Sequence, residues 1–315
     1  MKLIIQVPCY NEETTLGQVL AELPKKINGI DVIETMIIDD GSSDNTIDIA
    51  NEYKVDYIIK HVGNKGLGNA FKSGIERALR EGADIVVNTD GDNQYPGRYI
   101  PDLVQPIIVG DADFVMGNRQ TKNIAHFSLL KKFFQWLGSL LVRFFSGTNV
   151  PDSVSGFRAY SREALLRLNV TSDFSYAVDT LVQAGSKRIK IAYIPMTTNR
   201  PTRPSRLFKN MWQHMYKTFS ILLRVYAMYH PMRMFFTFAG IFFTLGVLGV
   251  LRFIYLYLTI DGPTGHVQSL VLSGALLTIA TVFFALGIIG DLISKNRRLI
   301  EDNLYFSKKA YFEKK

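Results

Sequence analysis

Two aspartates, one residue apart, follow a short apolar stretch and could together bind a metal ion. Asp90 and Asp92 flank Gly91, and residues 84–87 before them are expected to form a buried strand. Side chains at positions i and i+2 of an extended chain point the same way, so the two carboxylates can converge. Carboxylates that close repel each other unless a cation lies between them, and Mg²⁺ or Mn²⁺ held by such oxygens usually holds a phosphate too. Taken alone, the same residues could also form a solvated turn.

The composition narrows the classes of partner. The chain has 315 residues, is 47% hydrophobic and carries a net charge of +8. Such a basic, apolar-rich chain favours nucleic acid, anionic lipid or phosphorylated small molecules as partners. Cys9 is the single cysteine, which excludes an internal disulfide and a cysteine-based zinc site. Residues 1–8 are too short an apolar run for a signal peptide, so we expect the N-terminal domain in the cytosol.

The aspartates belong to a chain in which strands and helices alternate. Strands are expected over 2–8, 35–39, 55–60, 84–88 and 113–117. Helices are expected over about 14–26, 44–53 and 99–109, with another that follows the glycine-rich turn at 63–69 and ends near residue 80. This alternation predicts an α/β domain with a mostly parallel sheet and helices on both faces. In such sheets the ligand lies at the carboxyl ends of the strands. The acidic and glycine-rich loops all fall at those ends, at 10–13, 39–44, 63–68, 90–94 and 118–119.

The second part of the chain has the pattern of a membrane protein. Residues 235–258 and 270–289 are apolar runs long enough to cross a bilayer, and their short link predicts a hairpin. Basic residues flank both outer ends of the hairpin and none lie in the link, which puts both flanks in the cytoplasm. Arg252, near the far end of the first run, could snorkel outward or bind a lipid phosphate or the neighbouring span.

Two basic amphipathic segments, 127–145 and 207–229, fit helices in a membrane interface, although each could also face a protein core. The predicted organisation is a catalytic domain at 1–206 with an interface helix at about 126–146, a juxtamembrane helix at 207–230, spans at 235–259 and 268–291, and a cytoplasmic tail at 292–315. From Lys308 onward we expect a charged, mobile end.

Two further segments could bind phosphate. Residues 152–158 combine serines, a glycine and Arg158 in one expected loop. Arg200, Arg203 and Arg206 lie three residues apart in a proline-rich stretch. Guanidinium groups suit phosphate oxygens, although a basic loop beside anionic lipid headgroups would have the same composition.

In combination, these segments resemble family 2 glycosyltransferases with the GT-A fold. Within that family the chain is most similar to the polyprenyl-phosphate sugar transferases, which include dolichol-phosphate mannose synthases and bacterial undecaprenyl-phosphate enzymes. The matching segments occur in the family order over about residues 1–206, and the complete set is far more specific than any one motif. They are 7–13 (VPCYNEE), 39–44 (DDGSSD), 63–69 (GNKGLGN), 90–94 (DGDNQ), 117–119 (GNR) and 155–158 (SGFR).

The resemblance implies a role for individual residues. Donor nucleotide binding falls to Pro8, Tyr10, Asn11, Glu12, Asp39, Asp40, Lys65 and Asp90, and it stays open whether Asp39 or Asp40 contacts the base. Metal binding falls to Asp90, Asp92 and Gln94. The acceptor phosphate would meet Arg119 and Ser155, with Arg158 replacing an arginine that many relatives have where this chain has Pro151. Arg200 and Arg206 match a phosphate-binding pattern by position and charge, but Arg203 replaces its glycine. The catalytic set would be Asp92, Arg119, Ser155 and Arg158.

The implied reaction is an inverting, Mg²⁺- or Mn²⁺-dependent transfer of a monosaccharide from a UDP- or GDP-sugar to undecaprenyl or dolichyl phosphate at the cytoplasmic face. A phosphate nucleophile is already ionised at neutral pH, so no strong general base is needed, and none of the motifs contains a histidine. The alternatives are a membrane-tethered transferase acting on a growing glycan or another lipid, and a non-catalytic lipid-binding scaffold. Nucleic acid binding is not expected, because the basic residues cluster near the apolar segments. The hairpin could also join copies of the chain into a homo-oligomer.

Overall fold

The computed structural model divides the protein into two compact units, Met1–Leu222 with Asp302–Lys315, and Leu223–Glu301. The structure describes residues 1–120, 143, 147–148, 150–152, 155–170, 176–199, 220, 223–224, 226–259 and 267–313. Most of the predicted interface helix at 126–146 and of the juxtamembrane helix at 207–230 lies outside the described residues, as do Arg200, Arg203 and Arg206.

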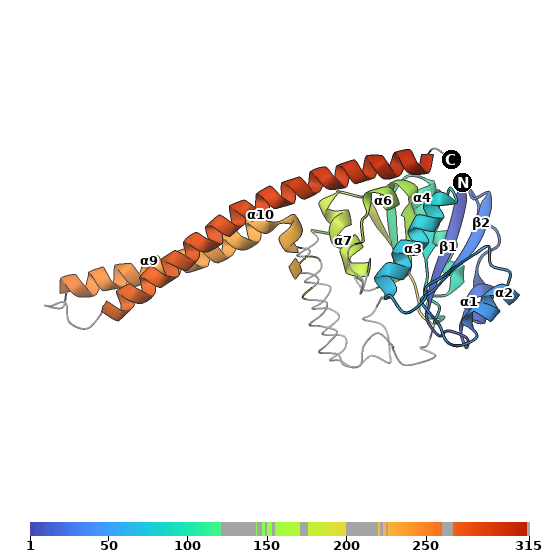
Figure 1. Ribbon diagram of the computed structural model, residues 1–315, viewed down its shortest axis with the longest axis horizontal. Coiled ribbons are helices and arrows are strands. Elements are labelled where there is room, and N and C mark those ends of the chain that lie inside the picture. Colours follow the sequence, from blue (N-terminus) through green and yellow to red (C-terminus); the bar gives the residue numbers. More distant parts are fainter. Residues whose placement is uncertain are drawn as a thin grey trace. The chain divides into compact units, whose positions relative to one another are not determined.

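The first unit is built on a single sheet, which confirms the predicted α/β architecture (Figure 1). Its described strands are β1 (Lys2–Cys9), β2 (Val32–Asp39), β3 (Tyr57–Lys60), β4 (Ile85–Asn88), β5 (Phe114–Asn118), β6 (Arg158–Ser161) and β7 (Ile191–Pro195). They lie in the order β3-β2-β1-β4-β6-β5-β7. The pairs β2–β3, β1–β2, β1–β4 and β5–β7 are parallel, whereas β6 is antiparallel to both β4 and β5. The expected loop around Arg158 therefore includes a strand.

Helices cover both faces of this sheet. The first unit contains α1 (Leu16–Glu22), α2 (Thr46–Glu52), α3 (Leu67–Arg80), α4 (Ile100–Ile108), α6 (Arg162–Arg167) and α7 (Tyr176–Ser186). Successive strand residues point to opposite faces, so Leu3 and Ile5 pack with Leu103 of α4, whereas Gln6 lies under Gly74 of α3. This alternation buries two apolar layers and leaves the strand ends free for polar chemistry.

The second unit contains two long helices, α9 (Pro231–Thr259) and the part of α10 (Val267–Glu313) up to Glu301. Both helices are long and apolar enough to cross a membrane, and they form the expected hairpin. On α10 the buried positions recur every seven residues, at Ser273, Ala280, Gly287 and Ser294. Small residues at this spacing let two helices pack closely along one stripe. The large apolar side chains point outward, as expected for contact with lipid.

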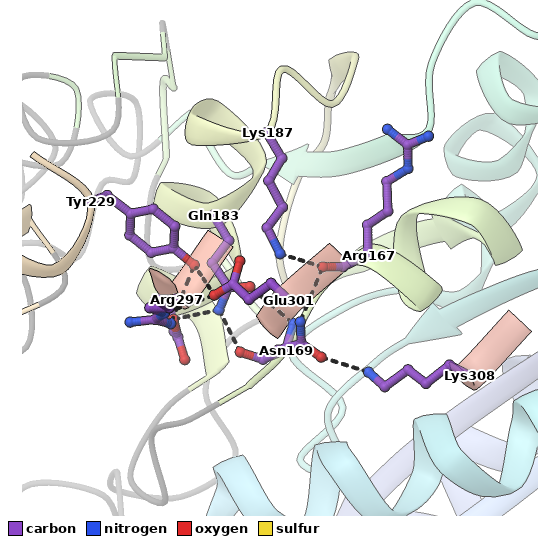
Figure 2. Close-up of polar contacts among 9 residues, drawn as sticks. Arg167, Asn169, Gln183, Lys187, Tyr229, Arg297, Glu301 and Lys308 are labelled. Atoms are coloured by element: carbon purple, nitrogen blue, oxygen red, sulfur yellow. Dashed lines mark hydrogen bonds and ion pairs between the residues drawn. The ribbon is translucent and has the colours of Figure 1, made fainter. Parts of the chain in front are cut away.

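The end of α10 belongs to the first unit, and its side chains hold the segment around α6 (Figure 2). Lys308 Nζ donates to Asn169 Oδ1 at 2.7 Å, and the Tyr305 hydroxyl donates to Glu163 Oε1 at 3.0 Å. The expectation of a mobile end from Lys308 was wrong, because these polar contacts fix a helix that continues to Glu313.

Candidate active site

The predicted site segments meet at one edge of the sheet. The parallel strands β1, β2 and β4 end at Cys9, Asp39 and Asn88, so the loops that follow them emerge side by side. The antiparallel strand β6 begins at this same edge, because Arg158 pairs with Asn88. Residues 155–157 therefore lie beside the loop that carries Asp90 and Asp92.

Asp39 and Asp40 have different surroundings, although they are neighbours in the sequence. Asp39 is fully buried: its Oδ1 accepts from the Ser42 main-chain N–H at 3.0 Å, and its Oδ2 has no hydrogen-bond partner among the described residues. A buried carboxylate oxygen in this state is costly for the fold, which makes it a candidate to bind a ligand donor.

Asp40, in contrast, holds the glycine-rich turn. Its carboxylate accepts from the main-chain N–H groups of Lys65 and Gly66, each at 2.9 Å, and lies 2.7 Å from His61 Nδ1. His61 Nε2 lies 3.0 Å from the Ser73 hydroxyl of α3. Asp40 and the buried His61 thus fix the glycine-rich turn at this edge of the sheet, while the Lys65 side chain is exposed.

The loop after β1 is joined to the loop after β2. The main-chain N–H of Asn11 donates to Ser42 Oγ, and Asn11 Oδ1 accepts from the Ser43 main-chain N–H, both at 2.8 Å. Glu12 is buried, and its main-chain N–H donates to Thr46 Oγ1 at 2.8 Å. Pro8 lies buried within β1, whereas the Tyr10 ring is 39% exposed at the rim. Of these predicted nucleotide-binding residues, Tyr10 presents the most accessible flat surface.

Asp92 lies close enough to Asp90 to affect its ionisation. Burial and the charge of Asp92 raise the pKa of Asp90 to about 7, while the Arg119 charge opposes this rise. Gln94 Nε2 donates to Asp92 Oδ2 at 2.8 Å, so the three predicted metal ligands are grouped together. The described residues contain no cluster of three or more His, Cys, Asp or Glu side chains placed to hold a metal. The chemistry of the two carboxylates and of the Gln94 amide oxygen nevertheless suits a hard divalent cation, which these three side chains would hold.

Gly156 closes the site beside Asp90. A Cβ atom at Gly156 would lie 2.9 Å from Asp90 Oδ2, so only glycine leaves room for this carboxylate. The Gly156 main-chain N–H donates to the Tyr95 hydroxyl at 3.1 Å, and its carbonyl accepts from Asn88 Nδ2 at 3.0 Å and from the Tyr176 hydroxyl at 3.1 Å. Tyr95 and Tyr176 were not predicted as site residues, because neither lies in a recognisable motif.

The predicted acceptor residues have unequal access. Arg119 forms a bidentate ion pair with Asp152, with Nε–Oδ2 at 2.6 Å and Nη2–Oδ1 at 2.9 Å. Ser155 is fully buried, and in the part of the chain that the structure describes its hydroxyl has no hydrogen-bond partner. Asp152 was not among the predicted site residues, although its charge explains how Arg119 tolerates burial.

Arg158 is also fully buried, on the side of the sheet covered by α7. Its guanidinium donates to the Ser155 carbonyl at 2.7 Å, to the Ala177 carbonyl at 2.8 Å and to Thr180 Oγ1 at 2.9 Å. Arg158 therefore stabilises the main chain at Ser155 through the hydrogen bond to its carbonyl. A direct contact between Arg158 and an acceptor phosphate stays a prediction.

Comparison with known proteins identifies the family. The model of Glycosyl transferase family 2 matches residues 4–168. The chain belongs to this family. The match covers the site segments from Pro8 to Arg158, whereas Tyr176 and the arginines at 200–206 lie beyond it, and the chain is therefore a family 2 glycosyltransferase.

This family 2 glycosyltransferase has relatives with lipid-phosphate acceptors in their names. It is 32% identical to the UDP-N-acetylglucosamine–dolichyl-phosphate N-acetylglucosaminyltransferase of Methanococcus voltae, over 61% of this chain and 83% of that protein. It is 27% identical to the undecaprenyl-phosphate mannosyltransferase of Micrococcus luteus, over 62% of this chain and 83% of that protein.

The fold also matches a solved glycosyltransferase. Glucosyl-3-phosphoglycerate synthase from Mycobacterium tuberculosis, solved with Mn²⁺, UDP and glucosyl-3-phosphoglycerate, superposes with a TM-score of 0.53 at 24% identity. The match covers 70% of this chain and 79% of that one. This likeness confirms the predicted GT-A fold.

Proposed function

We propose that this glycosyltransferase transfers a monosaccharide from a nucleotide sugar to a polyprenyl phosphate. The observation that carries the proposal is the pairing of two features in one chain. One is a sheet edge with a metal-type carboxylate pair, and the other is a pair of apolar helices long enough to cross a membrane. The relatives from Methanococcus voltae and Micrococcus luteus, named for dolichyl and undecaprenyl phosphate, support the same acceptor class.

Asp39 is the better candidate to read the donor base. Its buried Oδ2 needs a donor, and uracil and guanine both present a ring N–H beside a carbonyl. Asp40 already accepts from Lys65, Gly66 and His61, so its role is to hold the turn beside the nucleotide. This division favours a UDP- or GDP-sugar as the donor.

Asp90, Asp92 and Gln94 would hold Mg²⁺ or Mn²⁺. When bound, the cation would neutralise charge on the departing nucleotide diphosphate. The relative solved with Mn²⁺ and UDP supports a divalent metal in this fold. Glu12, which is buried and adds to the negative field at Asp90, strengthens the demand for a cation at this position.

The acceptor phosphate would approach from the side of Ser155 and Arg119. The Ser155 hydroxyl, which has no hydrogen-bond partner among the described residues, can donate to a phosphate oxygen, and the Arg119 charge attracts the phosphate. An ionised phosphate oxygen attacks the anomeric carbon directly, so the C–O bond to the donor diphosphate breaks as the new one forms, with inversion. Arg200 and Arg206 would add to this phosphate site from the segment that follows Asn199.

The proposed topology has two spans, with the catalytic domain and both chain ends in the cytoplasm. It rests on the two apolar helices and on the basic residues that flank the hairpin, such as Arg233 and Lys295. A homo-oligomer formed through the hairpin stays a prediction.

A donor panel tests the proposed function. Purified full-length protein is incubated with Mn²⁺ or Mg²⁺, undecaprenyl or dolichyl phosphate, and UDP- or GDP-linked glucose, mannose, galactose and their N-acetyl forms. One donor is expected to give a lipid-linked sugar that chelation of the metal abolishes. If no donor in the panel yields a lipid-linked sugar, the proposed function is wrong.

Metal binding is expected to weaken below neutral pH. Because the pKa of Asp90 is raised from 3.8 to about 7, a proton competes with the cation for this carboxylate. The apparent Kd for Mn²⁺ should rise as the pH falls through 7, by up to about tenfold per pH unit while one proton is displaced. Calorimetric titration with Mn²⁺ at several pH values measures this slope, and a Kd that does not change with pH would contradict it.

The raised pKa of Asp90 also makes the stability of the protein without added metal depend on pH, and here the stability falls as the pH rises. The folded protein binds the Asp90 proton more tightly than the unfolded chain, since the folded pKa is the higher one. The contribution of Asp90 to stability is therefore present below pH 3.8 and is lost as the pH rises through 7. Added Mn²⁺ should restore stability above neutral pH.

A further inference from the structure

Residues 90–94, which carry the proposed metal ligands and are called the metal loop below, include a residue in a backbone conformation that residues other than glycine rarely adopt. Asn93, between Asp92 and Gln94, has a φ of 56°, in the left-handed region. Asparagine tolerates this region better than most residues, but it still needs support there. Because Asn93 joins the two ligand candidates, its backbone conformation determines the directions in which their side chains leave the chain.

The first support for this conformation comes from α1. Asn93 Nδ2 donates to Gln18 Oε1 at 3.1 Å, and the Asn93 side chain is 8% exposed. Its Oδ1 is buried and has no hydrogen-bond partner within the described ranges. The side chain of Asn93 is thus held by a single hydrogen bond, which is little to fix a left-handed residue.

The second support comes from Asn199, four residues beyond the end of β7 and more than a hundred residues away in the sequence. Its side chain Nδ2 donates to the Asn93 carbonyl at 2.9 Å, and its main-chain N–H donates to the Gln94 carbonyl at 3.0 Å. Asn199 therefore binds two successive carbonyl groups of the metal loop.

The segment around Asn199 is itself well anchored. Met196 is buried and its main-chain N–H donates to the Asn118 carbonyl at 2.9 Å. The Thr197 hydroxyl lies 2.9 Å from the Tyr99 hydroxyl. Because residues 196–197 are anchored by these contacts, Asn199 is held in place and can in turn fix the position of the loop that it binds.

We propose that Asn199 is a positioning residue, which holds Asn93 in its left-handed conformation so that Asp92 and Gln94 face the metal together. This inference rests on the proposed metal site. An asparagine suits the role because its amide supplies a donor to the Asn93 carbonyl without adding a charge beside the two carboxylates. Gln94 Nε2 donates to Asp92 Oδ2 at 2.8 Å, so the two side chains lie side by side.

The experiment measures Mn²⁺ binding directly, so that it does not depend on knowing the donor. Full-length wild type, Asn199→Ala and Asn199→Leu are titrated with Mn²⁺ alone, and free Mn²⁺ is followed by electron paramagnetic resonance. Thr197→Val is the matched control, because it removes a hydrogen bond of the same segment that does not involve the metal loop. Thermal unfolding of each variant reports its stability.

Both Asn199 variants are expected to raise the Kd for Mn²⁺ by about fivefold to tenfold, the effect of the one lost side-chain hydrogen bond to the Asn93 carbonyl. The Kd of Thr197→Val for Mn²⁺ should stay within about twofold of the wild-type value, even where this variant lowers Tm as much as the Asn199 variants do. In turnover assays, the Mn²⁺ concentration for half-maximal rate should rise, with kcat at saturating Mn²⁺ little changed. Asn93→Ala should weaken binding as well, and its combination with Asn199→Ala should be less than additive.

The inference is overturned if wild type binds Mn²⁺ and the Asn199 variants bind it equally well, or if Thr197→Val weakens binding as much. In that case the proposed function still stands. If wild type itself binds neither Mn²⁺ nor Mg²⁺, both the inference and the proposed metal site are wrong. Should Asn199→Ala fail to fold, Asn199→Leu, which keeps the branched shape and the number of heavy atoms of the side chain, decides the question.

Discussion

Asp92→Ala is expected to lower turnover by about a thousandfold or more, since it removes half of the carboxylate pair that would hold the cation beside the leaving diphosphate. The fold should survive, because Asp92 is only partly buried and lies in a loop. Asp92→Asn should lose nearly as much activity, although it can still accept from Gln94 Nε2, since it lacks the charge. Turnover with the donor found in the panel measures both effects.

Asp111→Ala is the control for this substitution. Asp111 is exposed and precedes β5, so it lies at the opposite edge of the sheet from the site. Its replacement should leave turnover near the wild-type value. The metal assignment fails if Asp92→Ala retains more than about a tenth of wild-type turnover, since a lost metal ligand should cost far more.

Gly156→Ala is expected to lower turnover by about a hundredfold, because a displacement of a reacting group by about 1 Å can cost that much. The added Cβ would lie 2.9 Å and 3.0 Å from the two Asp90 carboxylate oxygens and 3.2 Å from the Tyr176 hydroxyl. The Asp90 carboxylate is the end of a side chain and can move away from the added methyl group. Gly156→Ala should therefore lose only about 1–2 kcal/mol of stability. Activity should therefore fall much further than Tm.

Gly274→Ala serves as the matched control, because a Cβ there meets nothing within 4 Å and the residue lies inside a helix. Turnover and thermal unfolding of the two variants separate a local effect at Asp90 from a general cost of the added methyl group. Wild-type turnover in Gly156→Ala would mean that Asp90 does not need its observed position.

The main features of the fold follow from local sequence patterns. Apolar runs that end in acidic or glycine-rich loops predicted the parallel strands and their common functional edge, and the apolar runs at 235–258 and 270–289 predicted the hairpin. The strand β6 was missed, because it has four residues and forms only by pairing with the distant strands β4 and β5. Such long-range pairing leaves little signal in a short polar segment.

The roles of charged residues depended on packing that the sequence does not contain. Arg158 has the composition of a phosphate ligand, but it is enclosed by Phe114, Tyr176 and main-chain carbonyls. Asp39 and Asp40 could be distinguished only once the turn at Lys65 was seen to fold back onto Asp40. The same limit applied to Asn199, whose importance arises from contacts with residues more than a hundred positions away.

The acceptor requirement tests the central claim most directly. Wild-type protein with its metal and the active donor is given either undecaprenyl phosphate or undecaprenol, which lacks the phosphate, in the same detergent. The proposed mechanism predicts a lipid-linked sugar of inverted anomeric configuration with the phosphate and none with the alcohol, since only the phosphate brings an ionised nucleophile to Arg119 and Ser155. Equal transfer to the alcohol, or transfer to water-soluble acceptors in preference to both lipids, would contradict it.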